Sequence, residues 1–185
     1  MNPFRVSHSV GVEVILYPRH EQLKKEIYDW LLHYKDIQNH GTNVKATMTE
    51  WNIVSPEINE LKDYIIRSLK SLPLSIGWGP AWDFKFSNLW ANIYRYGQYT
   101  NSHDHLPEEL TMVYFLTSEK GDAPLVIDDG DDQIPVLPQE GSIVMFPAYI
   151  KHSVPKHESN NIRITLSGDI NRIRSVSGDL NRIKE

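Results

Sequence analysis

The chain has 185 residues, of which 40% are hydrophobic and 10% aromatic, so a single compact domain with a sizeable core is expected. Its 19 Lys and Arg residues against 24 Asp and Glu give a formal net charge of −5, which argues against a nucleic-acid partner held through its phosphates. The absence of cysteine excludes disulfides, thiolate metal sites, iron–sulfur clusters and a cysteine nucleophile. Any bound metal therefore depends on His, Asp, Glu or water.

No stretch of the sequence approaches the ~20 consecutive apolar residues that a membrane-spanning helix needs. Residues 1–5 (MNPFR) also lack the apolar run of a signal peptide. The simplest expectation is a cytoplasmic protein without a membrane partner.

An opening strand and two helices are predicted in the first part of the chain. Residues 10–17 are rich in β-branched and aliphatic side chains and end at Pro18, which predicts the strand. Apolar residues then recur at spacings of three and four over about residues 20–35, the pattern of an amphipathic helix. A second helix is expected from the Ser-Pro pair at 55–56 to about residue 71, because serine caps a helix and proline is tolerated in its first turn.

The segment 72–82 (LPLSIGWGPAW) contains two glycines, two prolines and two tryptophans, which predicts an irregular loop. Trp78 and Trp82 in this loop either form part of a lid over a substrate or pack beneath the loop as ordinary core residues.

The rest of the chain has the pattern of a mainly β protein. Its apolar or alternating runs are short and are separated by Gly, Pro and Asp, which predicts several strands and a sandwich or barrel with the N-terminal helices laid against it. These runs are residues 84–96, 110–117, 124–128, 134–137, 142–146 and 161–170.

One domain over residues 1–185 is expected. In it, residues 1–82 pack on a β core at 83–170, and a tail follows at 171–185. The motif SGD(I/L)NRI occurs at 167–173 and again at 177–183. Two copies are too few for a solenoid, so we interpret them as a duplicated terminal strand or an exposed extension.

Three of the eight histidines lie where they could bind one metal ion. His103 and His105 are two residues apart, just after a predicted strand, and extended residues at this spacing point to the same face, while Asp104 points the other way. His152 follows the apolar run at 142–146. Surface histidines also occur at this spacing by chance, so the His-x-His pair alone does not establish a metal site.

Arg163 and Thr165 alternate with apolar residues in the last predicted strand. This alternation places the guanidinium and the hydroxyl together on the face opposite the apolar side chains. Arg163 is then either a solvent-facing residue of an edge strand or the bidentate partner of a carboxylate, to which Thr165 adds a hydrogen bond.

Four segments together resemble the 2-oxoglutarate and iron(II) dependent oxygenases, in particular the prolyl-hydroxylase-like branch and the oxygenases of phage and bacterial genomes. The resemblance spans about residues 88–170 and implies a double-stranded β-helix, a distorted, cupin-like jelly roll with the metal at its open end. The segments are NIYRYGQYTNSHDH at 92–105, VYFL at 113–116, GSIVMFPAYIKHSV at 141–154 and RIT at 163–165.

The resemblance also implies roles for individual residues. His103 matches the first metal histidine and His152 the distal one. Arg163 and Thr165 match the pair that holds the far carboxylate of 2-oxoglutarate. Tyr94 stands where relatives place a tyrosine that bonds the same carboxylate, although it is equally compatible with an aromatic residue of the barrel interior.

One ligand position departs from the family pattern. The usual motif is H-x-D, and His105 occupies the place of the carboxylate, which leaves the metal site one unit more positive. We predict that His105 is the third ligand, because strand alternation turns Asp104 away; the alternative is a kink that turns Asp104 inward. Phe115 stands where a relative has a second tyrosine, so one hydrogen bond to the cosubstrate would be lost.

The function implied is that of an oxygenase that uses Fe(II), O2 and the cosubstrate 2-oxoglutarate, hydroxylates an unactivated C–H bond and releases succinate and CO2. One alternative is a three-histidine, cupin-like metalloenzyme without 2-oxoglutarate, for example a zinc hydrolase. Another is a noncatalytic barrel that binds a small acid or a sugar. Arg163 discriminates between the oxygenase and the zinc hydrolase, since a zinc hydrolase has no evident need for it. Ligand binding that is insensitive to chelators would favour the noncatalytic barrel.

The sequence does not identify the substrate, which is expected to be a small molecule or a peptidyl residue, and it leaves the oligomeric state open. Residues 42–55 and 72–82 are candidates for the mouth of the site.

Overall fold

The computed structural model describes residues 11–35, 42–71, 82–128, 130 and 132–174. These residues contain two helices and eleven strands. The helices are α1 (His20–Leu32) and α2 (Pro56–Ser71), and the strands are β1 (Glu13–Leu16), β2 (Val44–Lys45), β3 (Thr47–Met48), β4 (Trp82–Tyr94), β5 (Tyr99–His103), β6 (Leu110–Phe115), β7 (Leu125–Asp128), β8 (Gln133–Val136), β9 (Ser142–Pro147), β10 (His152–Val154) and β11 (Arg163–Arg174).

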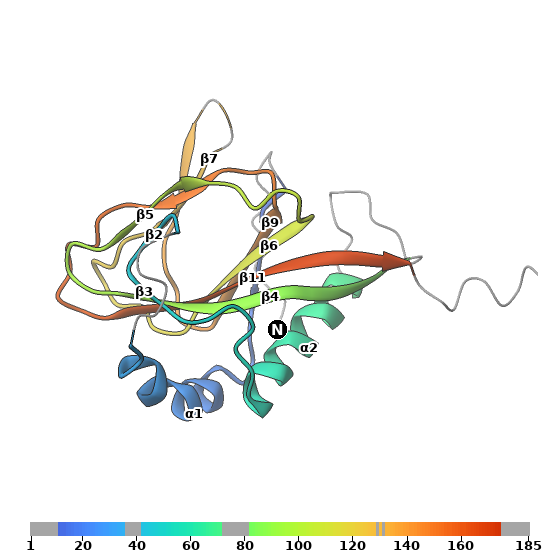
Figure 1. The fold of residues 1–185 in the computed structure, drawn as a ribbon, viewed down its shortest axis with the longest axis horizontal. Helices are drawn as coiled ribbons and strands as arrows, with labels where there is room; N and C mark the ends of the chain where they lie inside the picture. Colours follow the sequence, from blue (N-terminus) through green and yellow to red (C-terminus); the bar gives the residue numbers. More distant parts are fainter. Residues whose placement is uncertain (1–10, 36–41, 72–81, 129, 131, 175–185) are drawn as a thin grey trace, which may run out of the picture.

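The strands form two antiparallel sheets that face each other. The larger sheet has the order β1-β9-β6-β11-β4-β3, and the smaller has the order β2-β5-β10-β7-β8. Figure 1 shows β4 and β11 on one side of the interior and β5 and β7 on the other, with both helices outside the larger sheet. This is the predicted jelly roll, a double-stranded β-helix with N-terminal helices.

Both helices cover the outer face of the larger sheet. The apolar stripes of α1 and α2 pack in one core cluster with the outward-facing side chains of the sheet. Ser55 begins α2 as predicted, because its hydroxyl accepts a hydrogen bond from the backbone N–H of Ile58 at 3.1 Å. The apolar residues of β11 that take part in this core are Ile164, Leu166 and Ile170.

The opposite face of β11 points into the space between the sheets. β11 lies between β6 and β4, and its register with β4 pairs twelve residues, from Arg163 with Tyr94 to Arg174 with Trp82. Since side chains alternate along a strand, one face of β11 stabilises the helices while the other lines the interior. The interior-facing residues of β11 are Arg163, Thr165, Ser167 and Asp169.

The strands predicted from the sequence are present, with shifted ends and four additions. β4 begins at Trp82, and β11 continues to Arg174 instead of ending where a tail was expected, so the first SGD(I/L)NRI motif lies within β11. The short strands β2, β3, β5 and β10 were not predicted, because β2, β3 and β10 have only two or three residues and β5 (YTNSH) is too polar to show a hydrophobic period. Residues 72–81, with Trp78, and the second motif at 177–183 lie outside the described residues.

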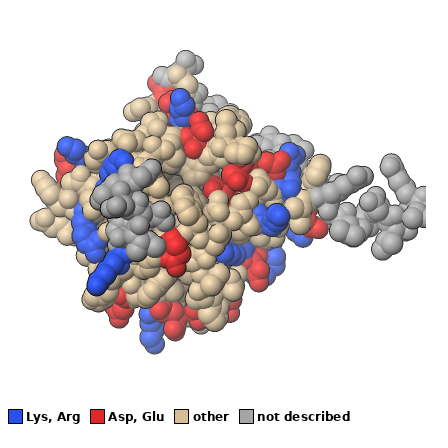
Figure 2. All heavy atoms as spheres, viewed as in Figure 1, with Lys and Arg blue, Asp and Glu red and all other residues tan. Residues whose placement is uncertain are grey.

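Among the described residues, no helix combines the length and the apolar character that crossing a membrane requires. Figure 2 shows Lys and Arg side chains interspersed with Asp and Glu on the face viewed. The described part of that face therefore presents no continuous basic surface.

The packing of α2 on the sheet predicts a large cost for truncating its apolar stripe. Leu61 is 0% exposed in the core beneath α2, whereas Leu137 is 76% exposed. Leu61→Ala is expected to lower the free energy of unfolding by about 2–5 kcal/mol because it leaves a cavity, and Leu137→Ala by less than about 0.5 kcal/mol. Urea denaturation measures both, and equal effects of the two substitutions would contradict the assigned packing.

Candidate metal centre

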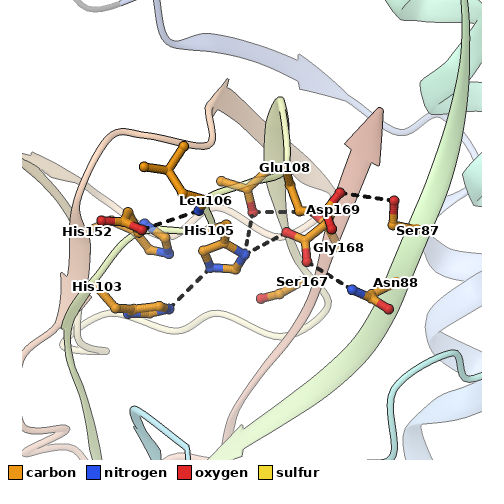
Figure 3. A network of polar contacts seen from close by, with 12 residues as sticks. Ser87, Asn88, His103, His105, Leu106, Glu108, His152, Ser167, Gly168 and Asp169 are labelled. Carbon is orange, nitrogen blue, oxygen red and sulfur yellow. Dashed lines mark hydrogen bonds and ion pairs between the residues drawn. The ribbon is translucent and has the colours of Figure 1, made fainter. Parts of the chain in front are cut away.

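Three histidines from two neighbouring strands converge at one end of the interior. His103 is the last residue of β5 and His152 the first of β10, and the two are register partners. His105 lies two residues beyond β5, where its backbone N–H donates to the carbonyl of Ala148 at 2.8 Å. One ring nitrogen from each of the three histidines lies within 4.8 Å of the others. Figure 3 shows the side chains of His103, His105 and His152 next to one another.

The Nδ1 atom of each ring faces an oxygen atom that accepts a hydrogen bond. The proton is therefore held on Nδ1, and the lone pair of Nε2 is left for a metal ion, as is usual for metal-binding histidines. The acceptors are the carbonyl of Asn101 for His103 at 2.8 Å, the carbonyl of Ile150 for His152 at 3.3 Å, and Oδ1 of Asp169 for His105 at 2.6 Å.

The spacing of these nitrogens suits one cation. The Nε2 atoms of His103 and His105 are 3.2 Å apart. Two nitrogens bound to one ion at about 2.1 Å, with an angle between 90° and 110°, are about 3.0–3.4 Å apart. Iron, zinc, nickel and copper all accept imidazole ligands, so the donor set fits a divalent transition metal without selecting one.

Burial favours the neutral, metal-binding form of His103 and His152. Desolvation, helped by the neighbouring rings of His103 and His105, lowers the pKa of His152 to about 3. Desolvation also lowers the pKa of His103. A metal ion therefore has little competition from protons at these two positions near neutral pH.

Asp104 lies between the two ligand candidates but does not join them. Its Oδ1 accepts a hydrogen bond from the backbone N–H of Leu106 at 3.2 Å. Asp104 also lines a cavity that borders His103 and His105. The three residues whose ligand atoms lie close enough together to hold one metal ion are His103, His105 and His152. The geometry therefore agrees with the alternation argument, although His105 itself lies outside the strand.

Arg163 is buried in the interior next to this cluster. The residue is 1% exposed and lies on a strand flanked by two others, so the interpretation as a solvent-facing arginine of an edge strand is wrong. Its guanidinium carbon lies 4.8 Å from the ring centroid of Tyr94 and 5.2 Å from that of Phe115. None of its three side-chain nitrogens has a hydrogen-bond partner among the described residues.

The charge and burial of Arg163 are compatible with an anion placed beside it. Desolvation lowers the pKa of the guanidinium, and the neighbouring hydroxyl of Tyr94 and the charge of Asp122 oppose that effect only in part. A buried guanidinium without hydrogen bonds is costly, and a carboxylate placed against it would satisfy both its charge and its N–H groups.

A narrow cavity connects Arg163 to all three histidines. Thr165 and Tyr94 also line it, as the sequence predicted for residues around a bound carboxylate. Tyr94 is buried, and its hydroxyl shares a hydrogen bond of 2.7 Å with the hydroxyl of Thr100. Tyr94 is thus an aromatic residue of the barrel interior that also borders Arg163.

A larger cavity of about 490 Å³ lies on the other side of His103 and His105. The ring of Trp90 stacks on that of His105 with a centroid distance of 5.7 Å and an interplanar angle of 14°, and Trp51 meets Trp90 edge to face at 4.6 Å. Asp104 and Glu108 lie in its wall. The histidines thus stand between a narrow cavity ending at an arginine and a wide one with room for an organic molecule.

Trp82, considered for a lid, is instead part of β4, where the guanidinium of Arg172 lies 5.0 Å from its ring centroid.

Sequence reasoning missed several residues of the two cavities. The missed residues follow from a signal that was available, because the alternation that relates Arg163 to Thr165 continues along β11 and across its register to β4. They are Ser167 and Asp169 on β11, and Asn88, Trp90 and Asn92 on β4.

Residues 128–169 match a family model described as "Putative 2OG-Fe(II) oxygenase". This segment includes His152, Arg163 and Thr165, so the resemblance drawn from the sequence motifs is confirmed there. Iron(II) and 2-oxoglutarate are the cofactors named in that description, and the three-histidine cluster is a donor set that iron(II) accepts. No curated protein sequence matches the chain significantly.

Solved structures with the same fold include enzymes that bind 2-oxoglutarate. A prolyl-4-hydroxylase of Pseudomonas putida is 14% identical, with a TM-score of 0.67 over 89% of this chain and 94% of that one. A viral collagen prolyl hydroxylase from Paramecium Bursaria Chlorella virus-1, solved with 2-oxoglutarate, is 16% identical, with a TM-score of 0.60 over 89% and 97%. HygX from Streptomyces hygroscopicus, solved with nickel, 2-oxoglutarate and hygromycin B, is 8% identical, with a TM-score of 0.67 over 88% and 83%. These likenesses show the fold.

The geometry of the cluster predicts which substitution removes the metal. His105→Ala deletes one of three converging nitrogens and is expected to abolish tight binding of Fe(II) or Co(II), whereas Asp104→Ala is expected to retain it. Metal content after dialysis, together with calorimetric titration, measures the difference. Greater loss of metal in Asp104→Ala than in His105→Ala would show that Asp104 is the ligand.

The low pKa of His152 predicts acid sensitivity of the metal-free protein. Below about pH 6.5 this histidine binds a proton in the unfolded chain, whereas in the folded chain it stays neutral down to about pH 3. The free energy of unfolding therefore falls as the pH drops through this range. The slope between about pH 6.5 and 5 should shrink by up to about 1.4 kcal/mol per pH unit in His152→Gln. His33→Gln, at an exposed histidine, is the matched control, and an unchanged slope in His152→Gln would refute the assignment.

Proposed function

We propose that this protein is a 2-oxoglutarate and Fe(II) dependent oxygenase that hydroxylates an unactivated C–H bond. The observation that carries the proposal is Arg163, a fully buried guanidinium that lacks a hydrogen-bond partner among the described residues and shares a narrow cavity with three converging histidines. A dicarboxylate that reaches from a metal ion to a buried arginine satisfies both features at once. A zinc hydrolase needs the histidines but leaves the buried charge unexplained.

The residues of the chain divide this work between them. His103, His105 and His152 would hold iron through their Nε2 atoms. Arg163 would form a bidentate pair with the far carboxylate of 2-oxoglutarate, with Thr165 and Tyr94 beside it. When bound, iron and 2-oxoglutarate supply the oxidising chemistry, with O2 as oxidant and succinate and CO2 as products.

The wide cavity is the proposed place of the substrate. It borders His103 and His105 on the side away from Arg163, so a substrate there approaches the metal without displacing the cosubstrate. Stacking of Trp90 on His105 limits the motion of one ligand and shields it from water. Among the proteins with a similar fold, one was solved with the small molecule hygromycin B and others are prolyl hydroxylases. A small molecule or a peptidyl residue fits the volume of the wide cavity.

Anaerobic titration of the protein with Fe(II) and 2-oxoglutarate tests this proposal. A visible charge-transfer band of the iron chelate is expected in the wild type. Arg163→Met keeps most of the side-chain volume but removes the charge, and it should weaken 2-oxoglutarate binding by on the order of 2–5 kcal/mol while metal binding survives. Arg19→Ala, at a surface arginine paired with Glu60, is the control.

Two results would count against the proposal. Unchanged 2-oxoglutarate affinity in Arg163→Met would exclude Arg163 as its partner. A protein that binds zinc tightly but gives no chelate band with Fe(II) and 2-oxoglutarate would favour the three-histidine metalloenzyme without this cosubstrate.

A further inference from the structure

Asp169 is a buried carboxylate in direct contact with a ligand candidate. The residue is 4% exposed, and its Oδ1 accepts a hydrogen bond of 2.6 Å from Nδ1 of His105. Figure 3 shows its side chain pointing from β11 toward the ring of His105, on the side away from His103. Neither the proposed iron ligands nor the proposed 2-oxoglutarate contacts account for a carboxylate at this position.

The fold holds Asp169 firmly in this place. Asn88, its register partner on β4, donates a hydrogen bond from Nδ2 to Oδ2 of Asp169 at 3.3 Å. The register shifts immediately afterwards, where Ile170 pairs with Phe86 instead of Ser87. Such a bulge redirects side chains next to functional sites, and here both oxygens of the carboxylate have defined partners.

The charge of the proposed metal centre makes the contact between Asp169 and His105 important for metal binding. Three neutral imidazoles bring no negative charge to a divalent ion, so the nearest anion matters for its binding. Asp104 is bonded to the N–H of Leu106, and Glu108 receives hydrogen bonds from Ser87 and Asn171. Among the carboxylates that line the wide cavity, Asp169 is the one bonded to a ring of the cluster.

We propose that Asp169 is a positioning residue of the metal centre. Its hydrogen bond fixes the proton of His105 on Nδ1, so that Nε2 faces the ion. It also gives His105 part of the negative charge that the three histidines lack, which makes this imidazole a stronger donor. This inference rests on the metal site of the proposed function but not on 2-oxoglutarate.

Titration of the metal-free protein with Co(II), in the absence of 2-oxoglutarate, measures the effect. Asp169→Asn keeps the size of the side chain and removes its charge, and it should weaken Co(II) binding by about 10–100-fold. Asp104→Asn is the matched control, since it removes a carboxylate from the same cavity without touching a histidine, and it should change the affinity less than about threefold. Equal effects of the two substitutions would overturn the proposal.

A second background separates positioning from a merely structural role. In His105→Ala the imidazole that Asp169 bonds is absent, so adding Asp169→Asn should change the residual Co(II) affinity by less than about threefold, although the same substitution weakens binding about 10–100-fold when His105 is present. A structural role predicts equally weaker binding in both backgrounds, and that result would overturn the proposal.

Nuclear magnetic resonance of the unaltered protein gives a test that does not depend on variants folding. Long-range nitrogen–proton correlation of labelled histidines should place a proton on Nδ1 of His105 in the metal-free protein. A proton on Nε2 alone would refute the proposal. If the variants change Co(II) affinity as expected but 2-oxoglutarate does not bind, the proposed function is wrong and the role of Asp169 is supported. If 2-oxoglutarate binds but Asp169→Asn leaves Co(II) affinity unchanged, only the role of Asp169 is wrong.

Discussion

The antiparallel pairing of β11 with β4 is the constraint on which the rest of the structure depends. Twelve register pairs, with one shift after Asp169, hold the two strands together, and each strand turns alternate side chains to opposite sides. Ile164 and Leu166 therefore stabilise the helices on the outer face, while Arg163 and Asp169 are held on the inner one. The packing that keeps the fold together thus also fixes the positions of Arg163 and Asp169 on the inner face.

Desolvation sets the chemistry of the inner face. It favours the neutral imidazole at His152, which a metal ion needs, and it leaves the guanidinium of Arg163 without the water that would otherwise solvate it. Without a ligand, the imidazole of His152 and the guanidinium of Arg163 therefore have a higher free energy here than they would have at the surface. The helices and the apolar outer core offset this cost, so the fold maintains an interior that is ready to bind.

Polar groups are arranged in order along this interior. Arg163 closes the narrow end, the three histidines lie in the middle, and the wide cavity opens beyond them past Trp90. A buried cation, a cluster of imidazoles and an open cavity therefore adjoin one another. The order follows from strand register, because residues two apart on one face of a strand stand about 7 Å apart along it.

The sequence by itself determined the local relations. Strand alternation showed that Arg163 and Thr165 share a face, and the motif resemblance brought His103, His105 and His152 together as candidates for one site. Neither argument showed that Arg163 is buried and unpaired, or that Asp169 meets His105. Periodicity is a property of the local backbone and survives in a single sequence, whereas burial and contact depend on the register between strands far apart in the chain. Only the tertiary structure decided that register.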